Sequence, residues 1–467
     1  MELWYNGSKY AATSQLFTYQ KYKSNVVGIA VGLSLGLGFL LAIVIVIAVI
    51  LYRRKAKGLL FNIKEPDYQL VAFGANTELA YRMPDDDFQF LETVLGRYNF
   101  AMQVAMSAVA PPTEEDLIAK SMLYVAQARG QSVGMINALV RGEIGRCKEE
   151  NTIFRNNSVA SKSFKFYSRV VGIPYLWKCM ARVIYELEVL GNRTAKEQEK
   201  STTDQHSTSL LRMTMEVDMD RYAGESNGGG GGSAADVDAE VNSLQLKLTC
   251  QKLFSVLVKN GVSDIPAEFR KIFVEIDSQI MKKFNNDMAV YKAIGGFFFL
   301  RFVCPAITAP HYYGLLTDPP NETTQRQLVL ISKVIQSLAN MQMPGRKETY
   351  MESMSDFIEK NMGAVVKFYQ DMREASRVDI GAAASMDVPD DVRLNALAGI
   401  WEFCISYQGK LQTEISQNTD PADRDALSQD FQALLQQYPT KPKKSGDAAS
   451  SKVPRSKKKR NTKDSTV

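Results

Sequence analysis

The sequence predicts an all-α protein in which one membrane-spanning helix precedes a large helical domain. First, the run Val26–Tyr52 contains no charged residue. Second, apolar residues from Phe88 onward recur at helical spacing. Third, no stretch alternates strand, turn and helix, and neither GxxxxGK[ST] nor GxGxxG occurs, so the chain has no nucleotide-cradling loop of its own. With 467 residues, of which 45% are hydrophobic, the chain can build a sizeable core.

The first predicted element is the membrane helix, residues 26–52. At this length a helix reaches roughly 40 Å, more than the ~30 Å hydrocarbon core of a bilayer. Arg53, Arg54, Lys55 and Lys57 follow it at once. The positive-inside rule therefore predicts a single-pass protein whose C-terminal side is cytosolic, in a membrane that we expect to be the plasma membrane.

Two features of the N-terminal region depend on this orientation. Residues 1–25 are expected to form a short non-cytosolic segment. In it Asn6 begins an N-x-S glycosylation signal, and the sequence allows both a glycosylated and an unmodified Asn6. Gly28, Gly32 and Gly36 lie four residues apart, which is typical of helices that dimerise in membranes but also reflects how common glycine is in spans. Homodimerisation through this ridge is one expectation.

The rest of the chain divides by composition. Residues 53–87 form a juxtamembrane linker, and 88–375 form the main helical domain. Within that domain the polar stretch 192–240, which includes five consecutive glycines at Gly228–Gly232, predicts a flexible insertion. Residues 376–438 predict a C-terminal helical extension, and 439–467 a disordered basic tail.

Charge and cysteine content exclude several classes of function. The net charge is +5, and Lys441–Val467 alone carries ten Lys or Arg against two Asp, so the excess describes a tail and not a nucleic-acid-binding domain. The five cysteines are widely spaced and there are two histidines. No metal site or disulfide framework is expected, and the main body fits a reducing compartment.

The first candidate site is the segment Thr152–Lys162, TIFRNNSVASK. Asn157 or Ser158 can cap the following helix, which Gly172 ends. Arg155 then lies on a loop before the helix, anchored by the buriable Phe154. Such an arginine can reach into a neighbouring molecule, although a lone arginine more often makes an ordinary ion pair.

The second is Ile294–Ile307, IGGFFFLRFVCPAI, which predicts a buried helix ending before Pro305. Arg301 lies in this apolar run, where an unpaired charge would be very costly. Its donors suit the backbone carbonyls of a nearby loop, so we expect it to brace one.

The third is Leu328–Asn340, LVLISKVIQSLAN. Its apolar residues form one helical stripe, while Lys333, Gln336 and Asn340 form another. The first predicts a core-facing surface. The second is either a solvated face or a surface for a partner's backbone and carboxylates.

In this order the three segments resemble the Ras-GAP catalytic domain. That family shows the patterns LFR-x-N-S-L-A-S-K, FLRF-x-x-PA-I and L-x-x-K-x-x-Q-x-L-A-N, which match IFRNNSVASK, FLRFVCPAI and LVLISKVIQSLAN here. The resemblance extends over roughly Phe88–Asp371. It implies an all-α Ras-GAP-type domain that speeds GTP hydrolysis on a Ras-like small GTPase.

The resemblance also implies roles for residues. Arg155 would be the arginine finger, and Arg301 would brace the finger loop. The residues expected to contact the GTPase are Phe154, Asn157, Ser158, Lys162, Leu300, Lys333, Gln336, Asn340 and Lys347. No cofactor or metal is expected in this chain, because Mg²⁺ and GTP are carried by the partner in its GTP-bound state.

The tail and the alternatives complete the predictions. Lys457–Arg460 is expected to contact anionic lipids, with nuclear targeting or simple solubility as alternatives. The ending Asp464–Val467 resembles a PDZ-domain ligand, which would dock Val467 in a pocket. A non-catalytic membrane adaptor that binds GTP-loaded Ras and PDZ proteins is the alternative to a GTPase activator, and a plexin-like receptor is a more distant one.

Overall fold

The computed structural model describes residues 65–74, 81–82, 88–154, 157–200, 215–218, 233–259, 262–345, 349–376, 386–438 and 443–444. They belong to one compact unit, Glu65–Val467. Several predictions lie outside the described residues: the membrane helix 26–52 with its Gly28/Gly32/Gly36 ridge, Asn6, the tail to Val467, Arg155 and Lys347.

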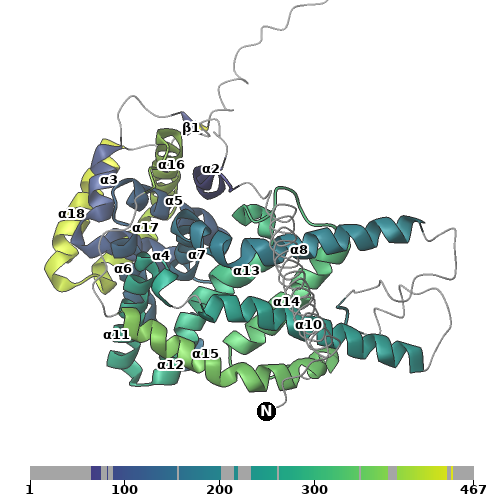
Figure 1. Cartoon of the computed structure of the whole chain (residues 1–467). Coiled ribbons are helices and arrows are strands. Elements are labelled where there is room, and N and C mark those ends of the chain that lie inside the picture. Colours follow the sequence, from purple (N-terminus) through teal and green to yellow (C-terminus); the bar gives the residue numbers. More distant parts are fainter. Residues whose placement is uncertain are drawn as a thin grey trace, which may run out of the picture. The chain divides into compact units, whose positions relative to one another are not determined.

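The described part of the chain is almost entirely helical, as the sequence predicts (Figure 1). The α-helices are α2 (Tyr68–Phe73), α3 (Gln89–Gly96), α4 (Ala101–Val109), α5 (Glu115–Ala128), α6 (Ser132–Arg146), α7 (Val159–Val171), α8 (Ile173–Lys200), α10 (Ser233–Lys259), α11 (Ala267–Phe284), α12 (Asp287–Gly295), α13 (Cys304–Thr308), α14 (Glu322–Ala339), α15 (Ser355–Ser376), α16 (Asp390–Ser406), α17 (Gln408–Asn418) and α18 (Pro421–Gln437). The 3₁₀ turns are η1 (Tyr98–Phe100), η2 (Glu150–Thr152), η4 (Val262–Asp264), η6 (Pro310–Tyr313) and η7 (Thr349–Met354), and η5 (Gly296–Val303) is a π-helix. Strands β1 (Tyr81–Arg82) and β2 (Lys443–Lys444) form a short antiparallel pair, with Tyr81 opposite Lys444.

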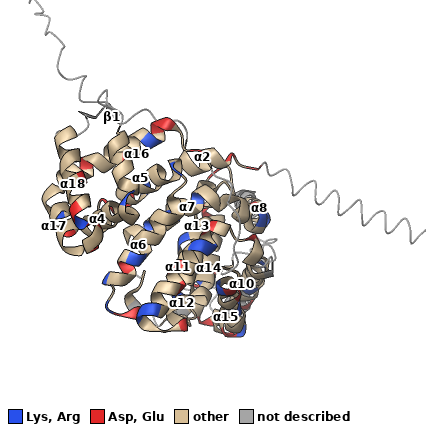
Figure 2. Ribbon diagram, turned by 90° about the vertical axis from the view of Figure 1, so that its left-hand side faces the viewer, with Lys and Arg blue, Asp and Glu red and all other residues tan. Residues whose placement is uncertain are grey.

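The C-terminal helices are part of the same body as the N-terminal ones. Helix α16 packs on α5, α17 on α4, and α18 on α3, at the end of the molecule opposite α8 and α10 (Figure 1). Trp401 and Phe431 are fully buried in these contacts. Helix α6 packs on α4, α7 and α11, and Figure 2 also places α6 beside α7.

The centre of the core is the π-helix η5, which carries the FLRF motif. Its four phenylalanines are buried, and Phe297 packs on Phe164 of α7 with ring centroids 4.8 Å apart. The prediction that this helix ends before Pro305 is wrong, since α13 continues it with Pro305 in its first turn. In the wider π turn the Cys304 N–H bonds to Phe299 O, five residues back, which eases the clash that proline makes in a regular α-helix.

Helical structure also extends into both ends of the predicted insertion 192–240. Helix α8 runs to Lys200 and α10 begins at Ser233. The sequence in these ends is polar, but it is rich in Ala, Glu and Lys, which are good helix formers. These residues therefore form helix in spite of their polarity. Residues 201–214 and 219–232, with the five glycines, lie outside the described part.

Among the described residues one continuous helical stretch, Asp287–Thr308, is long and apolar enough to cross a membrane. Its most apolar window is 83% buried inside the protein. This stretch is α12, η5 and α13, so its apolar character is explained by its central position in the core.

A close contact at the start of η5 gives a test of this packing. A Cβ atom on Gly295 would come within 2.3 Å of the Tyr369 hydroxyl, which is buried and donates to Ala339 O at 2.8 Å. We expect Gly295→Ala to lower the free energy of unfolding by about 1–3 kcal/mol, measured from the urea midpoint.

The matched control is Gly363→Ala in α15, where a Cβ would meet nothing within 4 Å. Because alanine is the better helix former, this change should raise stability by about 0.5–1 kcal/mol. Equal effects of the two substitutions would contradict the packing around η5.

Candidate functional site

The guanidinium of Arg301 holds the loop that joins α6 to α7. Its Nη2 donates to Phe154 O at 2.8 Å, and Nη1 donates to Gly296 O at 3.2 Å. The side chain is 8% exposed, and burial lowers its pKa, but a guanidinium remains charged in proteins. The expectation that Arg301 braces a loop through backbone carbonyls agrees with this contact.

Phe154, which accepts that bond, has a constrained backbone. Its φ is 50°, in the left-handed region that residues with a Cβ rarely adopt. Its ring is buried and packs edge-on against Phe297 at 4.6 Å between centroids. A non-glycine residue persists in this conformation only when its surroundings hold it, here by a ring contact and a charged hydrogen bond. Arg155, the next residue, lies outside the described part.

The far end of the loop is fixed by the start of α7. Ser158 is the N-cap, and its Oγ accepts from the Ser161 N–H at 3.3 Å, as predicted for one of the two capping candidates. The Ser158 hydroxyl also donates to Glu143 of α6. Asn157 is exposed, and Gly172 ends the helix at its other end.

Glu143 of α6 contacts the far end of this loop, where its carboxyl group accepts from the Ser158 hydroxyl. Burial raises the pKa of Glu143 to about 7, although Ser158, the nearby charges of Arg146 and Arg301, and the Phe154 N–H all act in the opposite direction. A carboxyl group with this pKa changes charge near neutral pH.

The near end of the loop is held by the turn between α11 and α12. Lys283 Nζ donates to Ile144 O and Gly145 O, each at 2.8 Å, and to Cys147 O. An ammonium group at these carbonyls caps the C-terminus of α6, where the helix dipole favours a cation. Asn286 caps α12 and donates to Glu150 Oε2 at 2.8 Å.

A groove of roughly 380 Å³ opens beside the loop. Among its lining residues are Phe154, Leu300, Arg301 and Asn340, all predicted to belong to one site. The structure therefore brings together residues from the loop, η5 and the end of α14 that are far apart in the sequence. Lys292 and Gln342, which no sequence motif indicates, also line it.

Helix α14 presents the two predicted faces. Leu328, Ile331, Ile335 and Leu338 are each at most 1% exposed, while Gln336 is exposed. Lys333 is partly buried, donates to the Tyr350 hydroxyl and lies 5.2 Å from the centre of that ring. Of the polar face, Asn340 lines the groove, and Lys333 is engaged with Tyr350 of η7.

Lys162 lies on α7 but contacts α5. Its Nζ is 3.1 Å from Glu115 and 3.3 Å from Asp116, and the side chain is 12% exposed. The structure thus gives it a role in packing two helices together. No group of His, Cys, Asp or Glu among the described residues has the arrangement of a metal site.

Glu143, Lys283 and Asn286 were not selected from the sequence. All three act on the loop from other elements, and each is a common surface residue type in an unremarkable context. The one local signal was Asn286, which follows Asn285 and precedes the α12 pattern in the manner of an N-cap.

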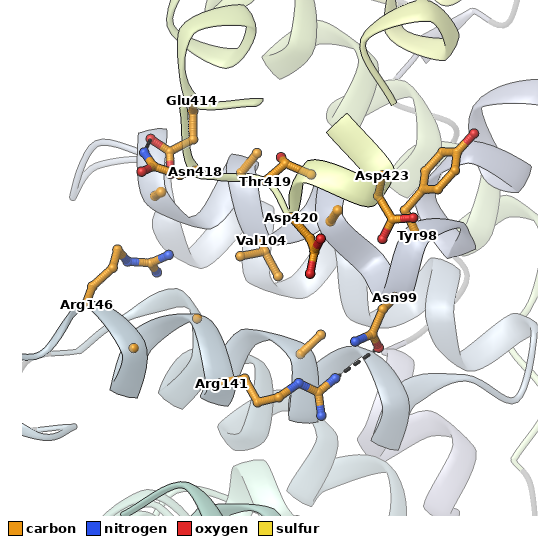
Figure 3. Close-up of a pocket in the computed structure, with 16 residues that line it drawn as sticks. Tyr98, Asn99, Val104, Arg141, Arg146, Glu414, Asn418, Thr419, Asp420 and Asp423 are labelled. Atoms are coloured by element: carbon orange, nitrogen blue, oxygen red, sulfur yellow. Dashed lines mark hydrogen bonds between the residues drawn. The ribbon is translucent and has the colours of Figure 1, made fainter. Parts of the chain in front are cut away.

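A second cavity, of about 600 Å³, is lined by residues of α6 and of the α17–α18 region (Figure 3). Arg141 and Arg146 line one wall, while Glu414, Asp420 and Asp423 of the α17–α18 region line the other. Arg141 donates to Asn99 at 2.9 Å and pairs with Glu275 at 3.0 Å. None of the residues predicted for the site lines this cavity.

Comparison with known proteins identifies a family match that includes the loop and the part of the chain that forms most of the groove. Residues 135–340 match the family described as GTPase-activator protein for Ras-like GTPase. The match begins in α6, ends at Asn340 and contains all three motifs. It supports a Ras-GAP domain in this chain.

Individual relatives give the same result over longer segments. The chain is 29% identical to the human Ras GTPase-activating protein nGAP over 60% of this chain and 22% of that protein. It is 27% identical to the rat Disabled homolog 2-interacting protein over 60% and 25%. It is 30% identical to the bovine Ras GTPase-activating protein 3 over 53% and 26%. The chain thus spans about a quarter of the length of these relatives.

Removing the Lys283 cap tests how the loop is held. We expect Lys283→Met to expose the α6 carbonyls and to speed amide hydrogen exchange in residues 147–154 about tenfold, the effect of roughly one charge-assisted hydrogen bond. The matched control is Lys282→Met, because Lys282 is exposed on the same turn. Similar exchange in both variants would show that Lys283 does not hold the loop.

Proposed function

We propose that the protein is a GTPase-activating protein that accelerates GTP hydrolysis by a Ras-like small GTPase, with Arg155 supplied in trans as the arginine finger. One observation carries the proposal: Arg301 of the FLRF motif donates to the carbonyl oxygen of Phe154, the residue directly before Arg155. The family match over residues 135–340 supports the class of partner.

The proposed chemistry needs one cation from this chain. In the partner, negative charge develops between the β- and γ-phosphates as the bond to the γ-phosphoryl group breaks. A guanidinium placed there in trans is worth about 10³–10⁵ in rate, or roughly 4–7 kcal/mol of barrier. Its planar fork of donors suits several oxygens at once, which lysine cannot reproduce. GTP and Mg²⁺ would belong to the partner, and this chain would need no cofactor.

The fixing of the loop fits this role. An arginine on a mobile loop must be ordered when the GTPase binds, and the conformational entropy lost in that step offsets part of its effect on the rate. A loop that is already braced loses less conformational entropy on binding. Arg301, Ser158, Glu143 and Lys283 restrain residues on both sides of Arg155. The groove with Leu300 and Asn340 would receive the switch regions of the GTPase, and Gln336, Lys333 and Lys347 are the further contact residues that the sequence predicts.

The location and other partners are part of the proposal and rest on sequence. The helix 26–52 would anchor the protein in a membrane with this domain in the cytosol, where lipidated GTPases are concentrated. The basic tail would add contacts with anionic lipids, Val467 would engage a PDZ domain, and Gly28, Gly32 and Gly36 would support a homodimer.

A non-catalytic adaptor is the second candidate. The observation that favours it is the similarity to a protein named for its interaction with Disabled homolog 2. An adaptor would bind the GTP-loaded GTPase through the same groove without changing its rate of hydrolysis. Arg155 would then be dispensable for the effect on the GTPase.

Single-turnover hydrolysis separates the two candidates. We expect the full chain in detergent to accelerate GTP hydrolysis by at least one member of a panel of Ras and Rap GTPases. Arg155→Ala should lower that rate about 10³-fold or more, and Arg155→Lys should recover little of it, because charge without the fork is insufficient.

The control is Arg129→Ala, which removes an exposed arginine at the end of α5. It should leave the rate unchanged. Binding to a GTP-loaded GTPase without acceleration, in the wild type as in Arg155→Ala, would refute the catalytic proposal and leave the adaptor.

A further inference from the structure

Helix α2 is a short helix that depends on its neighbours. It has six residues and lies within residues 53–87, which the sequence assigns to a linker. Asp67 caps its start by accepting from the Gln69 N–H at 3.0 Å and the Leu70 N–H at 3.2 Å. Gly74, with a φ of 86°, ends it. Isolated helices shorter than about 12–15 residues are marginal in water, so α2 is stabilised by its contacts with the helical body.

The C-terminal end of α2 is held by side chains of α7 and α5, and Figure 2 also places α2 beside α7. Arg169, in the last turn of α7, donates from Nη2 to Val71 O at 2.8 Å. The Tyr124 hydroxyl of α5 donates to Ala72 O at 3.3 Å, and its ring packs edge-on against Phe73 with centroids 5.3 Å apart. A guanidinium at the last carbonyls of a helix also interacts favourably with the helix dipole.

The same guanidinium joins α2 to a third element, η6. Arg169 Nη2 also donates to Tyr312 O at 3.1 Å, and the guanidinium lies 5.7 Å from the centre of the Tyr313 ring. A Cβ on Gly314 would come within 2.7 Å of Pro66, so the residue that leads into α2 rests directly on this glycine. Arg169 is thus the point at which α7, α2 and η6 meet.

The apolar contact that holds α2 is small. Ala72 and Phe73 are its buried side chains, at 6% and 7% exposure, while Leu70 is 51% exposed. Hydrophobic stabilisation grows with the apolar area removed from water, and two side chains remove far less than a long amphipathic helix does. Segments with few buried apolar contacts are those that open most readily while the rest of a protein stays folded. Helix α2 therefore has the properties of an element that can leave the helical body without unfolding it.

Release of α2 would act directly on α7. The half-buried Arg169 guanidinium would lose the Val71 carbonyl, one of its two described acceptors. At the other end of α7, Ser158 caps the helix and donates to Glu143 of α6. Because a packed helix moves as a rigid element, loosening of its last turn reaches the turn that follows the loop between α6 and α7.

We propose that α2 is a regulatory strap: docked on α5 and α7 it holds α7 in the position that supports GTPase activation, and its release lowers that activation. The effect on GTP hydrolysis rests on the proposed function, whereas the coupling of α2 to α7 is a property of this chain alone. The strap acts through α7 and touches neither GTP nor the GTPase. A partner that captures α2 would therefore act as an inhibitor.

The first test needs no GTPase and uses the full chain in detergent. Phe73→Asp places a charge in the buried contact with Tyr124 and should release α2. We expect amide hydrogen exchange in residues 70–74 to become fast, and exchange in residues 167–171, at the end of α7, to rise about tenfold. Exchange in α15 should not change, which separates local release from global unfolding.

The matched control is Leu70→Asp, the same kind of change at an exposed position of the same helix. It should keep wild-type exchange in α7. A second variant, Arg169→Met, removes the guanidinium from α7 and leaves the sequence of α2 intact, and it should free the same two segments. Variants that free α2 while α7 keeps its protection, or that leave α2 itself protected, would overturn the strap.

The second test is single-turnover GTP hydrolysis by a GTPase that the wild-type chain activates. At saturating chain, Phe73→Asp and Arg169→Met should lower the maximal rate about tenfold, because the loop before α7 is less well positioned. The concentration of chain that gives half of this rate should stay within about twofold, since most residues that line the groove belong to α12 and η5. Leu70→Asp should match the wild type in both quantities.

The two tests fail in different ways. If the wild-type chain activates no GTPase of the panel, the proposed function is rejected, and hydrogen exchange still decides whether α2 is coupled to α7. A released α2 and a loosened α7 with an unchanged maximal rate would reject the regulatory role and leave the proposed function intact.

Discussion

A single buried guanidinium sets the geometry of the candidate site. Arg301 lies in the π-helix at the centre of the core, and its charge must be compensated there because an unpaired buried charge costs several kcal/mol. The compensation comes from carbonyl oxygens, and one of them belongs to Phe154 in the loop between α6 and α7. The buried charge of Arg301 is therefore compensated only when this loop packs against η5. The interaction that satisfies the core also positions the loop.

The energetic balance of the loop explains why several helices contribute to it. A left-handed residue such as Phe154 costs roughly 1–2 kcal/mol. A hydrogen bond to a charged group returns about 1.5–3 kcal/mol, and the ring contact with Phe297 adds about 0.5–1.5 kcal/mol. The hydrogen bond and the ring contact outweigh the backbone strain of Phe154 only while Arg301 and Phe297 stay in position. Those places depend on η5, α6, α7 and α11, so the stability of the loop is a property of the whole helical body.

The sequence predicted those parts of the site that local rules control. Ser158 could be identified as a cap from its position before an apolar run, and the faces of α14 from their spacing. The bracing role of Arg301 followed from the cost of a buried charge. Glu143 and Lys283 could not be found in this way, because their contacts form only when α6 has packed against α7 and α11. The continuation of the helix past Pro305 depends on the π turn before it, which spacing does not reveal. The polar composition of 192–240 does not predict its helical ends, which depend on the helix propensity of their Ala, Glu and Lys residues.

The surroundings of Glu143 raise a question of electrostatics, because a carboxylate near the loop could neutralise the cation that we propose Arg155 supplies. The donors on Glu143 answer it in part. The Ser158 hydroxyl donates to this carboxyl group from the N-cap of α7, and the nearby charges of Arg146 and Arg301 favour its ionised form. Burial opposes these effects and outweighs them, so the pKa of Glu143 is raised to about 7. Because the folded protein holds this proton more tightly than the unfolded chain does, ionisation of Glu143 lowers the stability of the fold as the pH rises toward 7. The buried acid beside the start of α7 is therefore most easily accommodated when it is protonated.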